Sequence, residues 1–268
     1  MKTITGIHGV PRSGTSWLAQ IFNASPEVTL KFQPLFSYAF KDQLNEMSSA
    51  EEITDFFNAI YASDDDFINM RDTELLKGYP HFMKSEEQPH LVFKHVRYHY
   101  VLPNIMNKNS KLKLILVVRN PMAVLSSWKN APREFNKDWS FSKEWKLAQN
   151  KNVDRADYFG FNKWKEATNM FLTLEKAYPN RVKIITYKSI LKNTLEVAEE
   201  LYQFAEITFG EQCVKFIRES KTKQVDDPNS VYKVKSNDEA YKMDLAIEFQ
   251  NEIIQNLKGT HLERFLNE

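Results

Sequence analysis

The chain has 268 residues, and its 36 basic and 35 acidic residues leave a formal net charge of +1. A hydrophobic fraction of 42% excludes a disordered protein, and the balanced charge excludes a global field that would attract nucleic acid or an anionic membrane. The single cysteine, Cys213, excludes an intrachain disulfide, and no apolar stretch approaches the ~20 residues of a membrane span. Because the N-terminus lacks the apolar run of a signal peptide, we expect a cytoplasmic protein with one domain over residues 1–268.

Predicted strands and helices alternate along the chain. The predicted strands are 3–10, 91–93, 111–118 and 182–187. The predicted helices are one that starts after Gly14 and ends before Pro26, then 51–62, 121–128, 159–177, 194–205, 211–220 and 240–256. Apolar strands that alternate with helices are typical of a parallel sheet covered by helices on both faces. We therefore predict an α/β fold with three layers.

Glycine is rare in the chain but concentrated near its start. Only 7 glycines occur, and Gly6, Gly9 and Gly14 fall within one short stretch. The segment GVPRSGTS (9–16) has the strand–loop–helix setting and the glycine spacing of a phosphate-binding loop, G-x4-G-K-[ST]. Backbone amides of such a loop and the N-terminus of the following helix bind anions. The sequence therefore predicts an anion site here.

Two positions depart from the pattern of nucleotide hydrolases. Thr15 replaces the lysine of the loop, so Arg12 must supply the cation. Arg119 follows the strand 111–118, where many nucleotide hydrolases carry a magnesium-binding Asp. Both changes favour a phosphate-rich ligand that protein cations hold without a metal.

Two motifs carry a family resemblance. The loop PRSGTSWL (11–18) resembles the 5′-phosphosulfate loop of sulfotransferases that use 3′-phosphoadenosine 5′-phosphosulfate (PAPS). The segment RNPMAVLSS (119–127) is similar to the 3′-phosphate motif of that family, an Arg followed eight positions later by a Ser. Weaker similarities, nearest to carbohydrate and bacterial sulfotransferases, lie in 25–35, 92–99, 185–190 and 221–235.

The resemblance implies a P-loop-like fold and an enzyme. Such an enzyme transfers a sulfonate from PAPS to a hydroxyl or amine in line and without a metal, and it releases adenosine 3′,5′-bisphosphate (PAP). The similarity at 25–35 favours a saccharide acceptor, and the aromatic content also suits a sterol, a phenol or a lipid-linked molecule. We expect 33–105 and 130–160 to shape the acceptor pocket.

The resemblance also implies roles in binding the 5′ end of PAPS. Arg12 contacts the bridging oxygen and the leaving phosphate, where negative charge grows in the transition state. Trp17 either flanks the adenine or is a buried helix residue. Backbone amides and hydroxyl groups hold the 5′-phosphate, and these belong to Ser13, Gly14, Thr15, Ser16 and Trp17.

Other residues are implied at the 3′ end. Arg119 and Ser127 bind the 3′-phosphate, and Ser126 is the alternative if the helix register differs. Tyr187 either lies near the adenine or packs in the core. The polar loop after 211–220 either closes over the 3′-phosphate or is solvated, and its lysines include Lys221, Lys223 and Lys233.

The proton acceptor is an open choice. Carbohydrate and tyrosyl-protein members carry a glutamate where this chain has Gln33, which cannot take a proton at neutral pH. His95 and His99 are candidates because histidine titrates near neutrality. Cytosolic members use a Lys-x-His pattern, whereas here Lys94 directly precedes His95, and we expect Lys94 to contact the sulfonate or the acceptor. We prefer His95, since active sites of open α/β sheets lie at strand ends.

Three other hypotheses concern a metal site, a nucleotide kinase and a non-catalytic protein. His95 and His99 could bind a metal from one helix face, but no third ligand is evident, so we expect no metal site. A nucleotide kinase would need a loop lysine and a magnesium carboxylate, which are missing at the expected places. A non-catalytic nucleotide-binding module is favoured only by Gln33.

Overall fold

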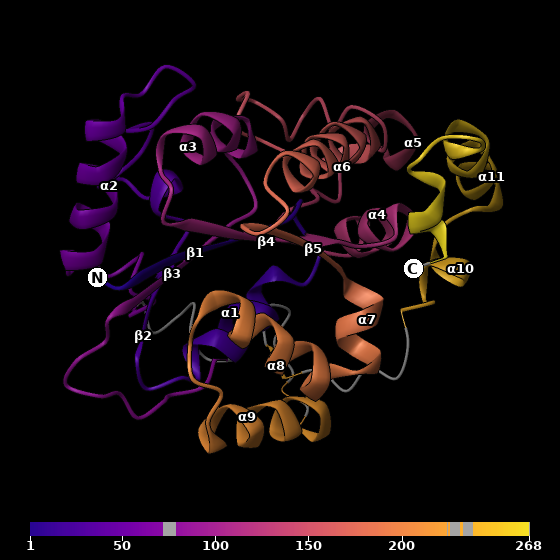
Figure 1. Cartoon of the computed structure of the whole chain (residues 1–268). Helices are drawn as coiled ribbons and strands as arrows, with labels where there is room; N and C mark the ends of the chain where they lie inside the picture. Colours follow the sequence, from indigo (N-terminus) through magenta and orange to yellow (C-terminus); the bar gives the residue numbers. More distant parts are fainter. Residues whose placement is uncertain (72–78, 224, 226–230, 233–237, 268) are drawn as a thin grey trace.

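A computed structural model of the chain describes residues 1–71, 79–223, 225, 231–232 and 238–267. Its centre is a five-stranded sheet with the order β2-β3-β1-β4-β5, in which all neighbours are parallel (Figure 1). The strands are β1 (Thr3–His8), β2 (Val28–Phe32), β3 (His90–His95), β4 (Leu112–Val118) and β5 (Val182–Thr186). Because the strands are parallel, the segments that follow β1, β3 and β4 meet at one edge of the sheet.

Helices cover both faces of this sheet, so the fold has three layers (Figure 1). One layer consists of α1 (Thr15–Asn23), α7 (Tyr187–Lys192), α8 (Thr194–Ala205) and α9 (Glu211–Thr222). The opposite layer consists of α2 (Ala50–Ala62), α3 (Leu102–Lys108), α4 (Pro121–Lys129), α5 (Phe141–Glu144) and α6 (Gly160–Ala177), with α10 (Tyr241–Asp244) and α11 (Ile247–Leu257) beside α4. Short 3-10 turns are η1 (Pro34–Phe36), η2 (His99–Val101) and η3 (Glu263–Leu266).

The alternation of side chains along β4 explains the two layers. Ile115 and Val117 belong to the apolar core shared with α1, α8 and α9. Leu114, Leu116 and Val118 belong to the opposite core, under α2, α3, α4 and α6. Successive residues of a strand point to opposite faces, so a continuous apolar run buries both faces at once. The predicted α/β class with a parallel sheet is confirmed.

The start of α4 is determined by local sequence. Asn120 caps the helix through its side-chain oxygen, which accepts a hydrogen bond of 2.9 Å from the amide of Met122. Pro121 occupies the first helical position, where a missing N–H costs nothing. This start places Arg119 directly between the end of β4 and the first turn of α4.

The structure also contains elements that the sequence did not predict. These are β2, α3, α5 and α7. The single helix predicted at 240–256 is two helices, α10 and α11, separated by extended backbone at Leu245 and Ala246. Lys31 interrupts the apolar pattern of β2, although its side chain is buried. Its Nζ donates hydrogen bonds to the carbonyl of Ser63 at 2.8 Å and to Oδ1 of Asn69 at 2.7 Å.

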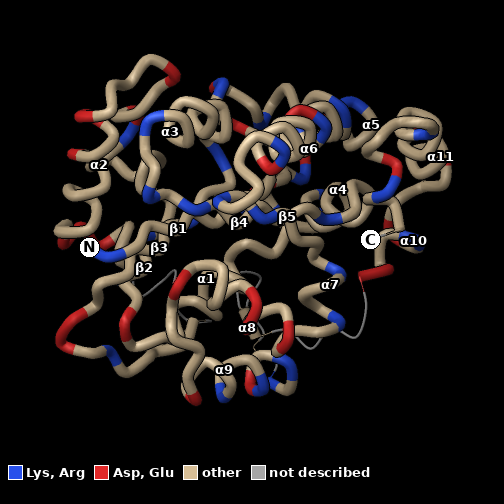
Figure 2. The backbone as a smooth tube through the Cα atoms, viewed as in Figure 1, with Lys and Arg blue, Asp and Glu red and all other residues tan. Residues whose placement is uncertain are grey.

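Charged residues occur throughout the surface layers. Figure 2 shows basic and acidic residues interspersed in both helical layers, in keeping with the net charge of +1. Among the described residues, no helix is both long enough and apolar enough to cross a bilayer.

Candidate active site

The loop between β1 and α1 requires glycine at two positions. Gly14 has a φ of 90°, in the left-handed region that favours glycine, and an added Cβ would lie 2.4 Å from the ring of Tyr187. An added Cβ at Gly9 would lie 2.7 Å from the carbonyl oxygen of Val117. Arg12 adopts a φ of 72° in the same turn. The loop therefore packs closely against the end of β4 and the start of α7.

The first turn of α1 presents unpaired donors beside this loop. The helix begins at Thr15 without a side-chain cap, so its first amides have no intrahelical acceptor. Ser13 and Thr15 are buried, and the Ser13 hydroxyl has no hydrogen-bond partner among the described residues. Donors of this kind at a helix N-terminus bind phosphate oxygens. The structure thus forms the strand–loop–helix arrangement that the sequence predicts.

Arg12 extends from the loop toward α4 and the segment after it. Its Nε donates a hydrogen bond to Oγ of Ser127 at 3.2 Å, and its Nη1 lies 3.8 Å from Oε1 of Glu134. Ser126 instead donates to Oδ2 of Asp244 at 3.2 Å. The register of α4 therefore turns Ser127, rather than Ser126, toward the loop.

Arg119 is nearly buried, with 6% of its surface exposed. Its Nε and Nη2 donate to the two carboxylate oxygens of Asp238 at 2.7 and 2.5 Å. Its Nη1 donates to the carbonyl of Arg12 at 2.6 Å, and its Cζ lies 4.8 Å from the ring centroid of Tyr187. The guanidinium group thus lies beside the loop, in the bidentate geometry that suits a carboxylate or a phosphate.

Trp17 and Tyr187 lie beside each other at the loop. Their rings meet edge to face with centroids 6.4 Å apart, and the indole N–H of Trp17 donates to Oγ of Ser220 at 3.0 Å. Tyr187 is the first residue of α7 and is buried, rather than the last residue of a strand. The two residues predicted near the adenine are therefore brought together.

Lys94 is buried in the last part of β3. Its Nζ lies 4.6 Å from the ring centroid of Phe32. Burial, together with the charges of Arg12 and Arg97, lowers the pKa of Lys94 to about 7, against the opposing effect of Glu134. A bound anion would favour the charged form of this lysine and raise its pKa.

Three buried histidines meet at the carboxyl ends of β1 and β3. His8 is paired in register with His95, and their ring centroids are 5.4 Å apart. Nδ1 of His8 lies 3.2 Å from Nδ1 of His99. Burial and Lys94 lower the pKa of His8 to about 3, and burial lowers the pKa of His95 and of His99 well below 6.5. All three imidazoles are therefore neutral near pH 7.

The two histidines that the sequence placed on one helix face do not share a helix. His95 ends β3, whereas His99 begins the 3-10 turn η2. Neither ring nitrogen of His95 has a hydrogen-bond partner among the described residues. In the described part of the chain, no group of three or more His, Cys, Asp or Glu side chains is placed to hold a metal ion.

Gln33 lies next to Lys94. Its backbone amide donates to the carbonyl of Lys94 at 2.8 Å, and its φ of 45° directs the chain away from β2 into η1. The side-chain oxygen of Gln33 is buried and has no hydrogen-bond partner in the described residues. Gln33 thus lies between the end of β2 and η1, with its backbone against the end of β3.

Two lysines at the start of the polar loop are described, and both have partners outside the glycine loop. Lys221 donates to the carbonyl of Leu191 at 3.1 Å, and Lys223 pairs with Glu219 at 2.8 Å. Lys233, like much of this loop, lies outside the described residues.

Three residues of the site were missed by sequence reasoning. Glu134, Asp238 and His8 contact Arg12, Arg119 and His99, respectively. Glu134 and Asp238 each stand near another acidic residue, Asp138 and Glu239, so nothing local distinguishes them. His8 could be found only from the pairing of β1 with β3.

A comparison with protein families identifies the family of the chain. The model of the family described as "Sulfotransferase domain" matches residues 4–253, nearly the whole chain. The chain therefore belongs to the sulfotransferase family. The prediction of a PAPS-dependent sulfotransferase is confirmed at the level of the family.

Solved structures share the fold. Mouse sulfotransferase SULT7A1 complexed with PAP is similar, with a TM-score of 0.58 and 16% identity over 100% of this chain and 89% of that chain. Retinol dehydratase in complex with androsterone and inactive cofactor PAP has a TM-score of 0.58 and 14% identity over 97% and 82%. The sulfotransferase domain from the curacin biosynthetic pathway has a TM-score of 0.53 and 16% identity over 96% and 98%. No curated protein matches the chain in sequence.

Proposed function

We propose that this protein transfers the sulfonate of PAPS to a hydroxyl or amine of a saccharide or another small acceptor. The observation that carries the proposal is the meeting of two arginines at the glycine loop, where Arg119 donates a hydrogen bond to the carbonyl of Arg12. PAPS carries anionic groups at both its 5′ and its 3′ position, and two guanidinium groups at one loop suit that distribution of charge. The PAP complexes of mouse SULT7A1 and retinol dehydratase support the same donor.

In this proposal the loop holds the 5′ end and Arg119 holds the 3′ end. Arg119 and Ser127 bind the 3′-phosphate, which replaces the carboxylate of Asp238 on the guanidinium group. Trp17 and Tyr187 flank the adenine. The 5′-phosphate is bound by the backbone and hydroxyl groups of Arg12, Ser13, Gly14, Thr15, Ser16 and Trp17.

The transfer is an in-line displacement at sulfur. The acceptor oxygen or nitrogen forms the new bond to sulfur while the bond from sulfur to the bridging oxygen breaks, and its electron pair leaves with PAP. Negative charge therefore grows on the bridging oxygen, where Arg12 and Lys94 stabilise it. The remaining contribution of the protein is to align the two reactants.

His95 is the residue that we propose to accept the proton from the acceptor. Its ring nitrogens have no hydrogen-bond partner among the described residues, so a lone pair of the neutral imidazole is available for the proton. The burial that lowers the pKa of His95 opposes this uptake, and the negative charge of bound PAPS would favour it. His99 is less suitable, because its Nδ1 faces His8 at 3.2 Å and its ring packs on Tyr158 with centroids 4.5 Å apart.

A panel of acceptors with ³⁵S-labelled PAPS tests the proposal. We expect labelled product and stoichiometric PAP with at least one saccharide, phenol, sterol or amine, and we expect His95→Ala to lose turnover while it still binds PAP. Full activity of His95→Ala would assign the proton-accepting role to His99 or to another group near Gln33. PAP binding without transfer to any acceptor would identify a non-catalytic binding module instead.

A further inference from the structure

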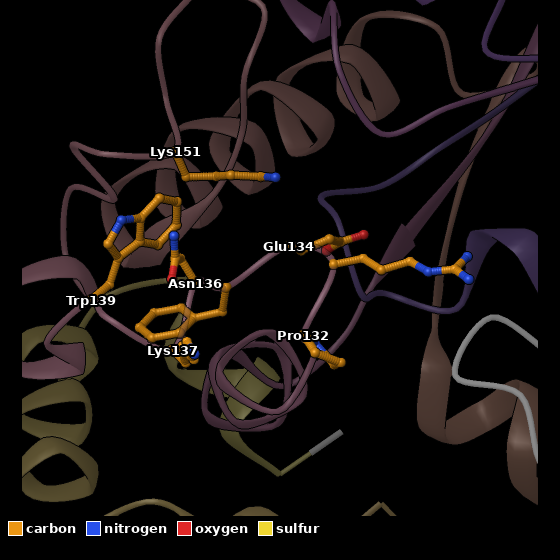
Figure 3. Close-up of a pocket in the computed structure, with 8 residues that line it drawn as sticks. Pro132, Glu134, Asn136, Lys137, Trp139 and Lys151 are labelled. Atoms are coloured by element: carbon orange, nitrogen blue, oxygen red, sulfur yellow. The ribbon is translucent and has the colours of Figure 1, made fainter.

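A pocket opens beside the loop that carries Arg12. It lies against the segment after α4 and has a volume of about 500 Å³, within the range of about 300–1,000 Å³ that is usual for small-molecule sites. One wall comes from residues 132–137 and Trp139. The other comes from Lys151, which reaches across from the side of Trp139 toward Glu134 (Figure 3).

The lining of this pocket is rich in cations. Arg133, Lys137 and Lys151 all line it, against a single carboxylate, Glu134. That carboxylate already faces Arg12, 3.8 Å away. None of the three lining cations forms an ion pair with a carboxylate of the described residues, and Nζ of Lys151 lies 5.0 Å from the ring centroid of Phe159. An anionic ligand can therefore pair with them without breaking an ion pair among the described residues.

Aromatic rings form the apolar part of the lining. Trp139 is half-buried and packs edge to face on the buried Phe135, with ring centroids 5.6 Å apart. This contact holds the indole in place, so its face is a preformed apolar surface for a flat ring. The lining thus combines a ring surface with anion-binding groups.

The pocket adjoins the reaction site through Glu134, which both lines the pocket and contacts Arg12. Burial lowers the pKa of Lys94 and of Lys151, and the negative charge of Glu134 opposes this effect on both. A molecule in the pocket therefore lies next to the group that we assign to the leaving phosphate.

We propose that this pocket is the acceptor site, and that the acceptor is a ring-containing molecule with an anionic group such as a carboxylate, sulfate or phosphate. The inference rests on the proposed function for its reaction. An anionic acceptor is repelled by the negative charge of PAPS, and Arg133, Lys137 and Lys151 offset that repulsion. Because charged pairs at such exposed positions are individually weak, specificity comes from their sum.

Matched probes that differ in charge test this inference. Galacturonate is compared with galactose, and 4-hydroxyphenylacetate with tyrosol, by calorimetric titration into the full chain saturated with PAP. We expect at least one acid to bind about tenfold more tightly than its neutral counterpart, and this preference to shrink as salt is raised. Equal binding of acid and neutral probe in both pairs, or no binding by either acid, overturns the proposal.

Charge variants locate the effect. Lys137→Glu and Lys151→Gln should each reduce the preference for the acid by about threefold or more. Lys176→Glu, at an exposed lysine in the last turn of α6, is the matched control and should retain it. A preference that survives in both pocket variants contradicts the assignment to this pocket.

PAP titration of the same samples separates the two proposals. Unchanged PAP affinity shows that each variant is folded and that its nucleotide site is intact. If PAP does not bind the wild-type chain, the proposal that PAPS is the donor is wrong. The preference for the acid is then measured in the chain without PAP, so the proposal on the pocket is still tested.

Discussion

Arg12 and Arg119 are joined by a hydrogen bond but face different partners. Arg12 contacts Ser127 and Glu134, beside the pocket, whereas Arg119 contacts Asp238 and Tyr187. A cation at the leaving group acts mainly in the transition state, and a cation at a remote phosphate acts mainly on binding. The two residues should therefore differ in their kinetic effects.

Steady-state kinetics with PAPS test this division. Arg12→Ala should lower kcat about 10²- to 10³-fold. Arg119→Ala should raise the KM for PAPS about 10- to 100-fold, because it removes charged hydrogen bonds in binding. Equal losses of kcat in both variants, with unchanged affinity for PAPS, would contradict the assignment of Arg12 to the leaving group and of Arg119 to the 3′-phosphate.

Asp238 competes with the 3′-phosphate for Arg119 in our account. Asp238→Asn removes the negative charge and should tighten PAP binding about tenfold, as measured by calorimetry. Glu239→Gln is the control, since Glu239 is exposed and pairs with Lys242 at 2.9 Å. Weaker PAP binding by Asp238→Asn would mean that the carboxylate orients Arg119 rather than competing for it.

At the scale of the elements, β1 and β3 bring neutral histidines to the edge of the sheet that carries the site. His8, His95 and His99 have pKa values far below those of an unfolded chain. At a pH between the folded and the unfolded pKa of such a histidine, the unfolded chain binds more protons than the folded chain. The folded state therefore loses stability as the pH falls below about 6.5. Above that pH these residues contribute no pH dependence.

Urea unfolding as a function of pH tests this consequence. Each such histidine should add a slope of up to about 1.4 kcal/mol per pH unit to the free energy of unfolding below pH ~6.5. His8→Asn should reduce the slope, and His261→Asn, at an exposed position, should retain it. A free energy of unfolding that stays constant between about pH 6.5 and pH 5 contradicts the burial of neutral imidazoles.

Local elements of the site could be predicted from the sequence, and long-range contacts could not. Strand–turn–helix units contain the glycine loop, Arg12 and Arg119. Their glycine spacing and apolar runs can be recognised in the sequence. The contacts of Arg119 with Asp238 and of His8 with His99 join distant segments through the sheet order. Strand β2 was hidden for a related reason, because its buried Lys31 is satisfied by partners beyond the strand.

For the molecule as a whole, a net charge of +1 is compatible with a local cluster of cations. Arg12, Lys94 and Arg119 gather at the carboxyl edge of one sheet, with Glu134 and Asp238 opposing them. A site of this kind attracts an anionic nucleotide without making the whole surface basic. The assignment of all 268 residues to one domain and to the cytoplasm stays a prediction.

Binding of PAP compared with ATP–Mg tests the central claim most directly. Calorimetric titration of the full chain should show micromolar PAP binding without added metal, and ATP–Mg binding weaker by about 100-fold, since Thr15 and Arg119 replace the lysine and the metal carboxylate of nucleotide hydrolases. Tighter binding of ATP–Mg than of PAP, or no binding of PAP, would contradict the account.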